Sequence, residues 1–525
     1  MDLLRRTGAI LSAHPRWAAP VLGALAACGF QPLALWPLTL LAFAGLIHLI
    51  GGAGTWRQAA LIGWLFGVGH FTLGNNWIAT AFTYQANMPA WLGWIAVFLL
   101  ALYLAVYPLL AALGGWWLGR RSQVALIAGF AGCWTIGEWL RAWVFTGFAW
   151  NPLGMTALGS FTRPGLAAIS PWLGTYALSA VVVLLAGLWL AALRRPWRDW
   201  RTAVAVLAPI VAFLLPFKGD DTRGRLPFTL VQPNVRQEVL DDPANFENQF
   251  QTTAALSVNR REGERRLVLW PESGVPDYLR EGYPFSFYRQ MTYAADPRAA
   301  RERIGRAIGA NSLLLTGAVD LEVRQGEVVA ARNVVTALDE RGALPASYAK
   351  AHLVPYGEYL PMRGLLEPLG LSRLVPGSLD FWPGPGPGTL DLGAWGKAGI
   401  QICYEIVFSG EVVDRRNRPD YLFNPSNDGW FGSWGPPQHL AQARMRAIEE
   451  GLPVLRATTT GISAVIDANG VVRDHIPRHI AGRIDGIMPP PKSPTWFARL
   501  GNVLPLAWAV VLIVLSLVAS RRRPE

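Results

Sequence analysis

The chain has 525 residues, 52% of them hydrophobic and 16% charged, and its formal net charge is +11. This length is enough for two domains. The basic residues form no single face, which argues against nucleic acid as a partner. No carboxylate occurs between Asp2 and Glu138. A soluble domain of that length needs a charged surface, so we expect the N-terminal half to lie in lipid.

Eight apolar stretches are long enough to cross a hydrocarbon core of roughly 30 Å. They lie at about 14–29, 33–51, 58–80, 89–113, 123–144, 168–193, 202–217 and 498–519. Many tryptophans lie near the ends of these stretches, where an indole ring suits the membrane interface. The sequence therefore predicts a membrane domain over residues 1–217 with seven helices, and a C-terminal transmembrane helix with its tail over 498–525.

Arginine placement predicts how the chain is oriented. Short cytoplasmic loops retain positive charge, and arginines gather before the first stretch and in alternate loops after it: Arg5, Arg6, Arg16, Arg57, Arg120, Arg194 and Arg195. Both termini are therefore predicted to be cytoplasmic, and residues 218–497 to lie on the opposite side. No cleavable signal peptide is predicted, because the first apolar stretch leads into further spans.

The segment 218–497 has a different periodicity, in which short β-rich runs alternate with helical stretches. We expect strands at 228–232, 267–270, 312–316, 328–338, 399–403, 421–423 and 463–467, and helices around 299–307 and 439–450. Such alternation favours a layered α/β domain. Residues 363–396 are dense in glycine and proline, which predicts a long loop able to act as a lid.

Three residues of this segment suggest a catalytic site. Cys403 ends an apolar run, while Cys28 and Cys133 fall inside predicted spans, so Cys403 has no disulfide partner in its own compartment. Glu272 follows Trp270-Pro271, and Lys350 flanks another strand-like run. Taken singly, each has an ordinary structural interpretation: a core cysteine, a turn residue and a solvated lysine. Their joint occurrence favours acyl transfer.

The chemistry gives each of the three a separate role. A thiol with a pKa of about 8.5 is mostly protonated at neutral pH, so it needs a base, for which Glu272 is the candidate. Lys350 would favour the thiolate and then the oxyanion of a tetrahedral intermediate. The backbone N–H groups that follow Cys403 would share the second task.

The strings Trp270-Pro271-Glu272, Lys350 to Tyr359 and Ile402 to Glu405 resemble the three catalytic segments of the nitrilase superfamily. With eight spans around this domain, the whole chain resembles the apolipoprotein N-acyltransferases, and the strings 424–432 and 438–447 extend the similarity. The resemblance implies an αββα sandwich over 218–497 in the periplasm of a bacterium, with the spans in its inner membrane.

The resemblance also implies the reaction and the partners. Cys403 would take an acyl chain from a phospholipid, typically phosphatidylethanolamine, as a thioester. The N-terminal amine of a diacylglyceryl apolipoprotein would then accept the chain. Supporting roles would fall on Glu358, Tyr404, Glu405 and, near the acyl path, Trp430.

In the membrane half, Gly147 to Trp150 resembles a family loop that faces the site, although Ala149 stands where proline is common. Arg141 precedes this loop. Arg141 suits a phospholipid phosphate, and an i,i+3 pair with Glu138 at the end of a span is the other interpretation. The sequence leaves both open.

Other functions remain as alternatives. A membrane-tethered amidase or hydrolase would use water where the transferase uses an amine. A transporter or scaffold is disfavoured, since the spans contain few ionisable residues. No cofactor or metal is expected, because there is no Walker loop and no paired metal spacing, and His352 and His439 are assigned structural or hydrogen-bonding roles.

Overall fold

The computed structural model describes residues 2–521 except 85–88, 121, 196–198, 215–221, 223, 262, 367 and 369–378. The chain forms two compact units, which are described separately. The first unit comprises residues 1–79, 90–218 and 494–525, and the second comprises 80–89 and 219–493. The domain boundary predicted at 217–218 lies outside the described residues.

The first unit is helical. Its helices are α1 (Asp2–Ala13), α2 (Pro15–Ala27), α3 (Trp36–Gly51), α4 (Trp56–Gly74), α5 (Ile78–Ala81, which ends in the second unit), α6 (Trp91–Leu104), α7 (Val106–Gly119), α8 (Gln123–Arg141), α9 (Ser170–Leu193), α10 (Trp200–Leu214), α17 (Trp496–Leu500) and α18 (Val503–Arg521). Each predicted apolar stretch contains at least part of one of these helices.

Among the described residues, three helical segments are long and apolar enough to cross a membrane: 91–119, 166–193 and 503–521. The stretch predicted as one span at 89–113 is divided at Ala105 into α6 and α7. Pro108 gives the reason, because it has no N–H to donate to the carbonyl of Leu104. Helix α1 was not predicted.

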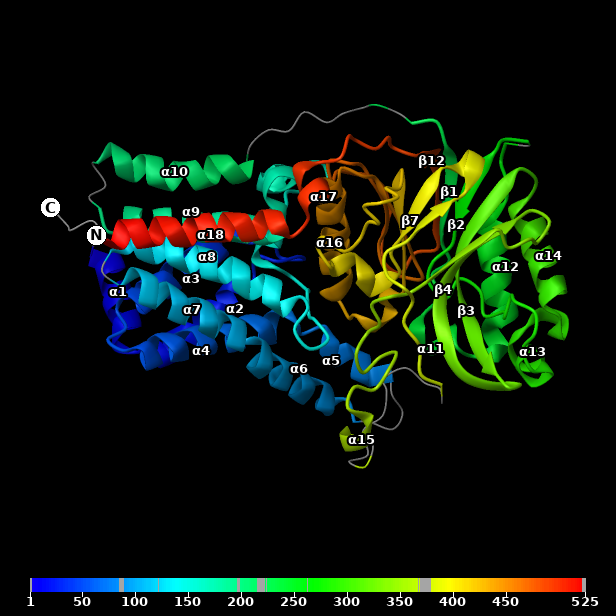
Figure 1. Ribbon diagram of the computed structural model, residues 1–525, viewed down its shortest axis with the longest axis horizontal. Helices are drawn as coiled ribbons and strands as arrows, with labels where there is room; N and C mark the ends of the chain where they lie inside the picture. The colour runs from blue at the N-terminus through cyan, green and yellow to red at the C-terminus, as the bar shows by residue number, and fades with distance from the viewer. Residues whose placement is uncertain are drawn as a thin grey trace. The chain divides into compact units, whose positions relative to one another are not determined.

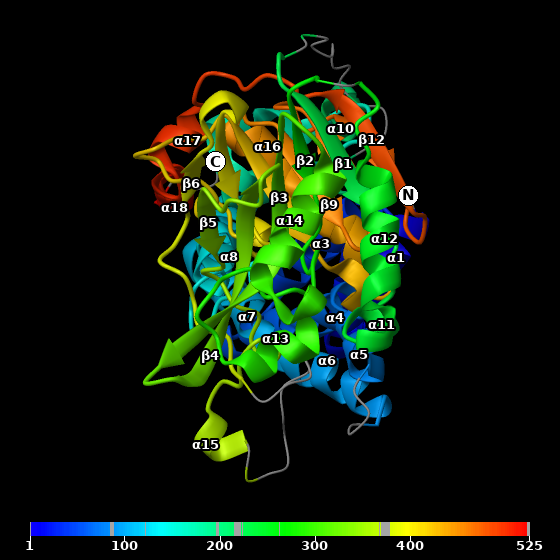
Figure 2. The same cartoon turned by 90° about the vertical axis from the view of Figure 1, so that its right-hand side faces the viewer.

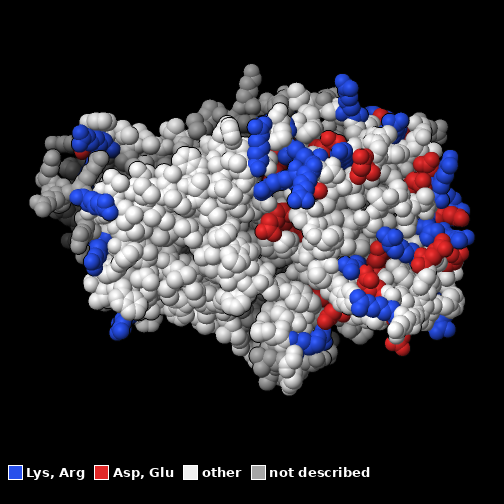
Figure 3. Space-filling model, viewed as in Figure 1, with Lys and Arg blue, Asp and Glu red and all other residues white. Residues whose placement is uncertain are grey.

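The helices of this unit pack closely through glycines. A Cβ atom placed on Gly69 of α4 would lie 2.0 Å from the carbonyl oxygen of Pro20 in α2. A Cβ on Gly23 of α2 would lie equally close, 2.0 Å, to the carbonyl oxygen of Phe66. Small residues at helix contacts allow such approach in lipid, where burial of apolar surface does not drive association. Figure 3 shows few charged side chains over these helices on the face in view.

The second unit contains two six-stranded sheets. The first has the order β12-β1-β2-β3-β4-β5 and the second β11-β10-β9-β8-β7-β6. The strands are β1 (Pro227–Gln232), β2 (Arg266–Leu269), β3 (Ser312–Arg324), β4 (Glu327–Asp339), β5 (Ala346–Ala349), β6 (Thr389–Asp391), β7 (Lys397–Ile400), β8 (Tyr421–Ser426), β9 (Val454–Thr458), β10 (Ser463–Ile466), β11 (Val472–Ile476) and β12 (Gly482–Ile487).

Helices cover the outer faces of the two sheets: α12 (Phe246–Ser257) and α14 (Pro297–Ile308) cover the first, and α16 (Gly435–Glu450) covers the second (Figure 1). The unit also contains α11 (Gln237–Leu240), α13 (Phe285–Met291) and α15 (Arg363–Leu366), of which α15 projects away from the sheets. Residues of α12 and α14 share one apolar core with β1, β2, β3 and β4, and Figure 2 shows these two helices in front of that sheet. On the other side, α16 packs on the second sheet.

The two sheets face each other and are joined by buried polar contacts. Gln232 at the end of β1 accepts a hydrogen bond from the Thr458 hydroxyl of β9 at 2.8 Å and from the Ser463 hydroxyl of β10 at 2.6 Å. Helix, sheet, sheet and helix therefore form four layers. The predicted layered α/β domain and the expected αββα sandwich are both confirmed.

Differences from the predicted elements are local. The strand expected at 399–403 ends at Ile400, and Cys403 instead begins a 3-10 helix, Cys403–Val407. The stretch 363–396, predicted as a long loop, contains α15 and the edge strand β6 in its described part. Residues 367 and 369–378 of that stretch lie outside the described residues. Strands β5, β6, β9, β11 and β12 were not predicted.

Candidate active site

The three predicted catalytic residues and Asn427 follow the ends of four strands. Glu272 lies three residues after β2, Lys350 directly after β5 and Cys403 three residues after β7, while Asn427 follows β8 directly. Parallel pairing of β2 with β3 and of β7 with β8 places such ends at the edges of the sheets, where open α/β structures collect functional side chains.

Glu272, Lys350 and Glu358 form a buried ionic cluster. The Lys350 ammonium lies 3.0 Å from Oε1 of Glu358 and 3.4 Å from Oε1 of Glu272, and its side chain is 2% exposed. The side-chain amide of Asn333 on β4 donates to both carboxylates, at 2.8 Å to Glu272 and 3.0 Å to Glu358. One ammonium is thus shared by two carboxylates whose remaining oxygens are also bound.

The backbone fixes each member of this cluster. The second oxygen of Glu272 accepts from the N–H of Asn427 at 2.8 Å, and that of Glu358 accepts from the N–H of Val354, also at 2.8 Å. Gly317 on β3 permits the close approach of the Glu272 backbone, since a Cβ there would lie 2.7 Å from the Glu272 Cα. Neither carboxylate can turn away without losing several bonds.

The charge state of Lys350 follows from this arrangement. Burial by itself lowers the pKa of Lys350, but Glu358, Glu272 and Cys403 outweigh burial and raise it above its ordinary value. The side chain therefore stays an ammonium at neutral pH. It can stabilise a developing negative charge but cannot act as a base.

Cys403 is 5% exposed and has φ +50°, a backbone conformation that residues other than glycine rarely adopt. Burial, and next to it the charge of Glu272, raises the pKa of the Cys403 thiol well above its ordinary value, against the opposing effect of Lys350. The thiol is protonated at neutral pH. Glu272 and Lys350 thus act electrostatically on the sulfur in opposite directions. To act as a nucleophile, a protonated thiol must lose its proton to a base.

Glu405 organises the loop after Lys350. Its Oε1 accepts from the Tyr348 hydroxyl at 2.8 Å and from the N–H of Ala351 at 2.7 Å, and its Oε2 accepts from the N–H of Ile402 at 2.7 Å. The carboxylate thus joins the segment that carries Lys350 to the segment that carries Cys403. Tyr404 packs edge-on against Phe408, with ring centroids 5.1 Å apart.

We expect Glu405→Gln to destabilise the protein by about 1–3 kcal/mol. In wild type, both carboxylate oxygens of Glu405 accept hydrogen bonds from buried N–H or hydroxyl groups. The NH₂ group of a glutamine cannot accept such a bond, so at least one of these buried donors loses its partner. The measurements are the melting temperature, which should fall, and the rate of the acylation of Cys403 that the sequence leads us to expect, which should also fall. Wild-type values of both would contradict this role of Glu405.

Two functional contacts were not predicted. Asn333 was not singled out, because it lies inside the strand β4. Only the register in which β4 pairs with β5 brings its side chain to the cluster. The role of Asn427 is carried by its backbone N–H, so no side-chain pattern indicates it. The string 424–432, already noted for its resemblance, is the sequence signal that could have directed attention to Asn427.

Trp430 ends the short 3-10 helix Asp428–Trp430 and is partly buried. Its ring packs edge-on against Tyr84, with centroids 5.6 Å apart. It therefore lies in the same unit as the cluster and only three residues after Asn427.

The remaining predicted residues lie in the helical unit. Nη1 of Arg141 donates to the carbonyl oxygens of Phe148 at 2.9 Å and Trp150 at 2.8 Å, so Arg141 holds the loop that resembles a family loop facing the site. Gly147 has φ +73°, which suits glycine at this turn. The Trp150 ring is 1% exposed and packs against Trp77, with centroids 4.5 Å apart.

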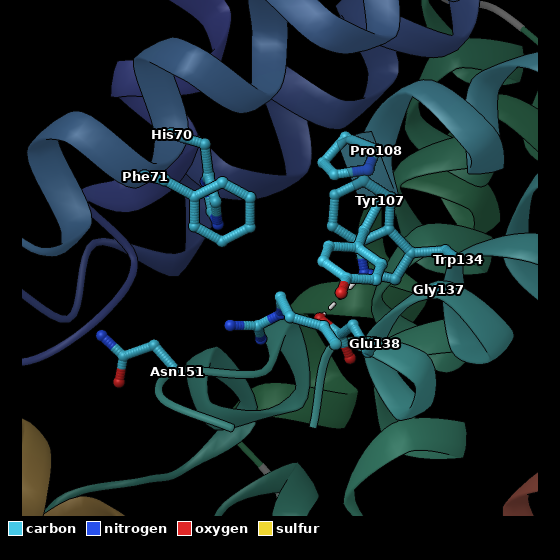
Figure 4. A pocket seen from close by; sticks show the side chains of 9 residues that line it. His70, Phe71, Tyr107, Pro108, Trp134, Gly137, Glu138 and Asn151 are labelled. Atoms are coloured by element: carbon cyan, nitrogen blue, oxygen red, sulfur yellow. Dashed lines mark hydrogen bonds between the residues drawn. The ribbon is translucent and has the colours of Figure 1, made fainter. Parts of the chain in front are cut away.

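Glu138 supports the segment that follows this loop. Its Oε1 accepts from the Trp134 indole at 3.0 Å and from the N–H of Leu153 at 2.6 Å. Figure 4 shows Glu138 beside a small cavity that His70, Phe71 and Tyr107 also line. The cavity volume is about 10 Å³, room for roughly one water molecule.

Comparison with known proteins agrees with both units. Residues 22–188 match the model of the apolipoprotein N-acyltransferase N-terminal domain, and residues 229–478 match the carbon-nitrogen hydrolase model. An amidase from Nesterenkonia sp. has 18% sequence identity and a TM-score of 0.33, and the match covers 52% of this chain and 94% of that chain.

Full-length relatives are more similar. The apolipoprotein N-acyltransferase of Rhodopseudomonas palustris is 34% identical over 96% of this chain and 94% of the relative. The apolipoprotein N-acyltransferase of Bradyrhizobium diazoefficiens is 34% identical, and the match covers 95% of this chain and 94% of the relative. The chain therefore belongs to the apolipoprotein N-acyltransferase family.

Proposed function

We propose that this acyltransferase carries the acyl chain on Cys403 and uses Glu272 as its base and Lys350 as its oxyanion stabiliser. The observation that supports this most directly is the buried cluster in which one ammonium contacts two carboxylates and acts electrostatically on the only thiol of the second unit. A protonated thiol, a carboxylate able to take its proton and a permanent positive charge are the groups that acyl transfer requires.

In the first half-reaction the acyl donor is a phospholipid, and phosphatidylethanolamine is the proposed one. The Cys403 sulfur attacks the ester carbonyl carbon while Glu272 takes the thiol proton. Lys350 and the backbone N–H that follows Cys403 stabilise the tetrahedral oxyanion. When the intermediate collapses, the glycerol oxygen leaves with the proton held by Glu272, which gives a lysophospholipid and a thioester.

In the second half-reaction the acceptor is the N-terminal amine of a diacylglyceryl apolipoprotein. The amine nitrogen attacks the thioester carbonyl and transfers a proton to Glu272. Collapse expels the Cys403 sulfur, which regains that proton, and the product is an amide. Glu358 keeps Lys350 in place through both steps, Glu405 and Tyr404 support the segment around the nucleophile, and Trp430 lies along the acyl path.

The membrane context is proposed with the reaction. Eight helices would span a bacterial inner membrane, with residues 1–217 and 498–525 in or at the membrane, both termini cytoplasmic, and 218–497 in the periplasm. The loop Gly147–Trp150 and Arg141 would serve the lipid substrate, Arg141 by holding the loop through its two carbonyl contacts.

The function is tested by incubating the purified protein with phosphatidylethanolamine and a diacylglyceryl peptide. We expect lysophospholipid and N-acylated peptide in equal amounts, and an acyl adduct on Cys403 when the peptide is omitted. Free fatty acid without N-acylated peptide would instead support the hydrolase, in which water attacks the same thioester.

A further inference from the structure

A buried histidine contacts the main chain of the nucleophile. Nε2 of His439, on α16, lies 3.0 Å from the carbonyl oxygen of Cys403, and the His439 side chain is 0% exposed. A carbonyl oxygen can only accept a hydrogen bond, so Nε2 carries the hydrogen in either charge state of the ring. The contact is long-range in sequence, since the two partners are 36 positions apart.

A second contact fixes the other side of the ring. Nδ1 of His439 lies 2.9 Å from Oδ1 of Asp428, and Nη2 of Arg456 lies 2.8 and 2.7 Å from the two Asp428 oxygens. Arg456 also lies 3.0 Å from Nδ1. Burial would raise the pKa of Asp428, but Arg456 and His439 outweigh it and hold the pKa at about 2. Asp428 is therefore a carboxylate, and the ring has no freedom to rotate.

The peptide group between Cys403 and Tyr404 is planar and trans, so its C=O and N–H point in opposite directions from one rigid plane. A hydrogen bond that fixes the carbonyl oxygen of Cys403 also fixes the direction of the Tyr404 N–H. This matters at Cys403, whose φ of +50° is not a conformation that the chain keeps without support.

We infer that His439 is a positioning residue for acyl transfer, which orients the Tyr404 N–H toward the oxyanion by binding the carbonyl of Cys403. The inference rests on the proposed function, in which that N–H and Lys350 share the oxyanion. Asp428 and Arg456 contribute indirectly, because they hold the His439 ring in place.

Two substitutions separate this role from simple packing. In His439→Gln the side-chain NH₂ reaches the position of Nε2 and can still donate to the carbonyl of Cys403. In His439→Asn the shorter side chain reaches only the position of Nδ1.

Gln442→Met is the matched control, because Gln442 lies on the same helix, is 1% exposed, and its side-chain amide has no hydrogen-bond partner among the described residues.

The experiment measures two reactions of Cys403 in the full-length protein. Acyl-enzyme formation from phosphatidylethanolamine passes through an oxyanion, whereas alkylation by iodoacetamide does not. We expect His439→Asn to slow acylation at saturating phospholipid by about 10- to 100-fold, since loss of one oxyanion donor has an effect of this order or larger. Alkylation should change by less than about threefold, and His439→Gln and the control should acylate nearly as wild type.

Three results would overturn the inference: acylation at the wild-type rate in His439→Asn, equal losses of acylation and alkylation in that variant, or a loss of acylation in folded His439→Gln. If His439→Asn does not fold, the acylation rate of His439→Gln alone tests the inference. Failure of His439→Gln to fold would also count against the inference. A wild-type acyl adduct on a residue other than Cys403 would instead refute the proposed function.

Discussion

Cys403→Ala is expected to lower the rate of N-acylation by at least about 10⁴-fold, because removal of a covalent nucleophile leaves only binding and the oxyanion donors. No acyl adduct should form when the variant is incubated with phosphatidylethanolamine, as intact-mass spectrometry of the purified protein would show. The small side chain fits the buried site, so the melting temperature should change little.

The control for this variant is Cys28→Ala. Cys28 lies in the helical unit, directly after α2, and its thiol donates to the carbonyl of Ala24 at 3.5 Å. This variant should keep the wild-type rate. Cys403→Ser should also be inactive, because a hydroxyl is much harder to deprotonate than a thiol whose pKa is already raised. An acyl adduct on Cys403→Ala would show that another residue is the nucleophile.

The three proposed catalytic residues stand out in the sequence because each lies in a distinctive string at or shortly after the end of a strand. Glu272 after Trp270-Pro271 and Cys403 after an apolar run mark the ends of β2 and β7, and these strands are buried throughout or nearly so. Their continuous hydrophobic pattern is the strongest local signal in the second unit. For Glu272 and Cys403, a residue type suited to catalysis therefore occurs where the sequence also predicts the end of a buried strand.

The contacts that hold the candidate site together depend on strand register and could not be predicted. Asn333 reaches Glu272 and Glu358 only because β4 pairs with β5 so that Val334 lies opposite Ala349, next to Lys350. His439 was assigned a hydrogen-bonding role, but its partner, the carbonyl of Cys403, has no sequence signature. Short edge strands such as β6 have too few residues for their periodicity to be detected.

The sequence likewise left the role of Arg141 open between a phosphate and Glu138. The structure shows a contact that neither interpretation included, with the carbonyl oxygens of Phe148 and Trp150. Backbone acceptors are present at every residue, so a pattern of side chains does not reveal which of them an arginine binds.

Lys350→Met is expected to have the second large effect, on stability as well as activity. Methionine has nearly the volume of lysine but no charge, so Glu272 and Glu358 would face each other in a buried site without the ammonium between them. Removal of one partner from a buried ionic cluster destabilises by about 3–5 kcal/mol. For a domain of this size, the melting temperature should fall by about 10 °C.

A second substitution separates the two effects. In Lys350→Met/Glu358→Gln the uncompensated charge is reduced to that of Glu272, which keeps its bonds from Asn333 and from the N–H of Asn427. Most of the lost stability should therefore return. Acyl-enzyme formation should remain undetectable, because no permanent positive charge faces the oxyanion. A double variant that regains both stability and acylation would show that Lys350 only balances the carboxylates, and the oxyanion would then depend on backbone N–H groups alone.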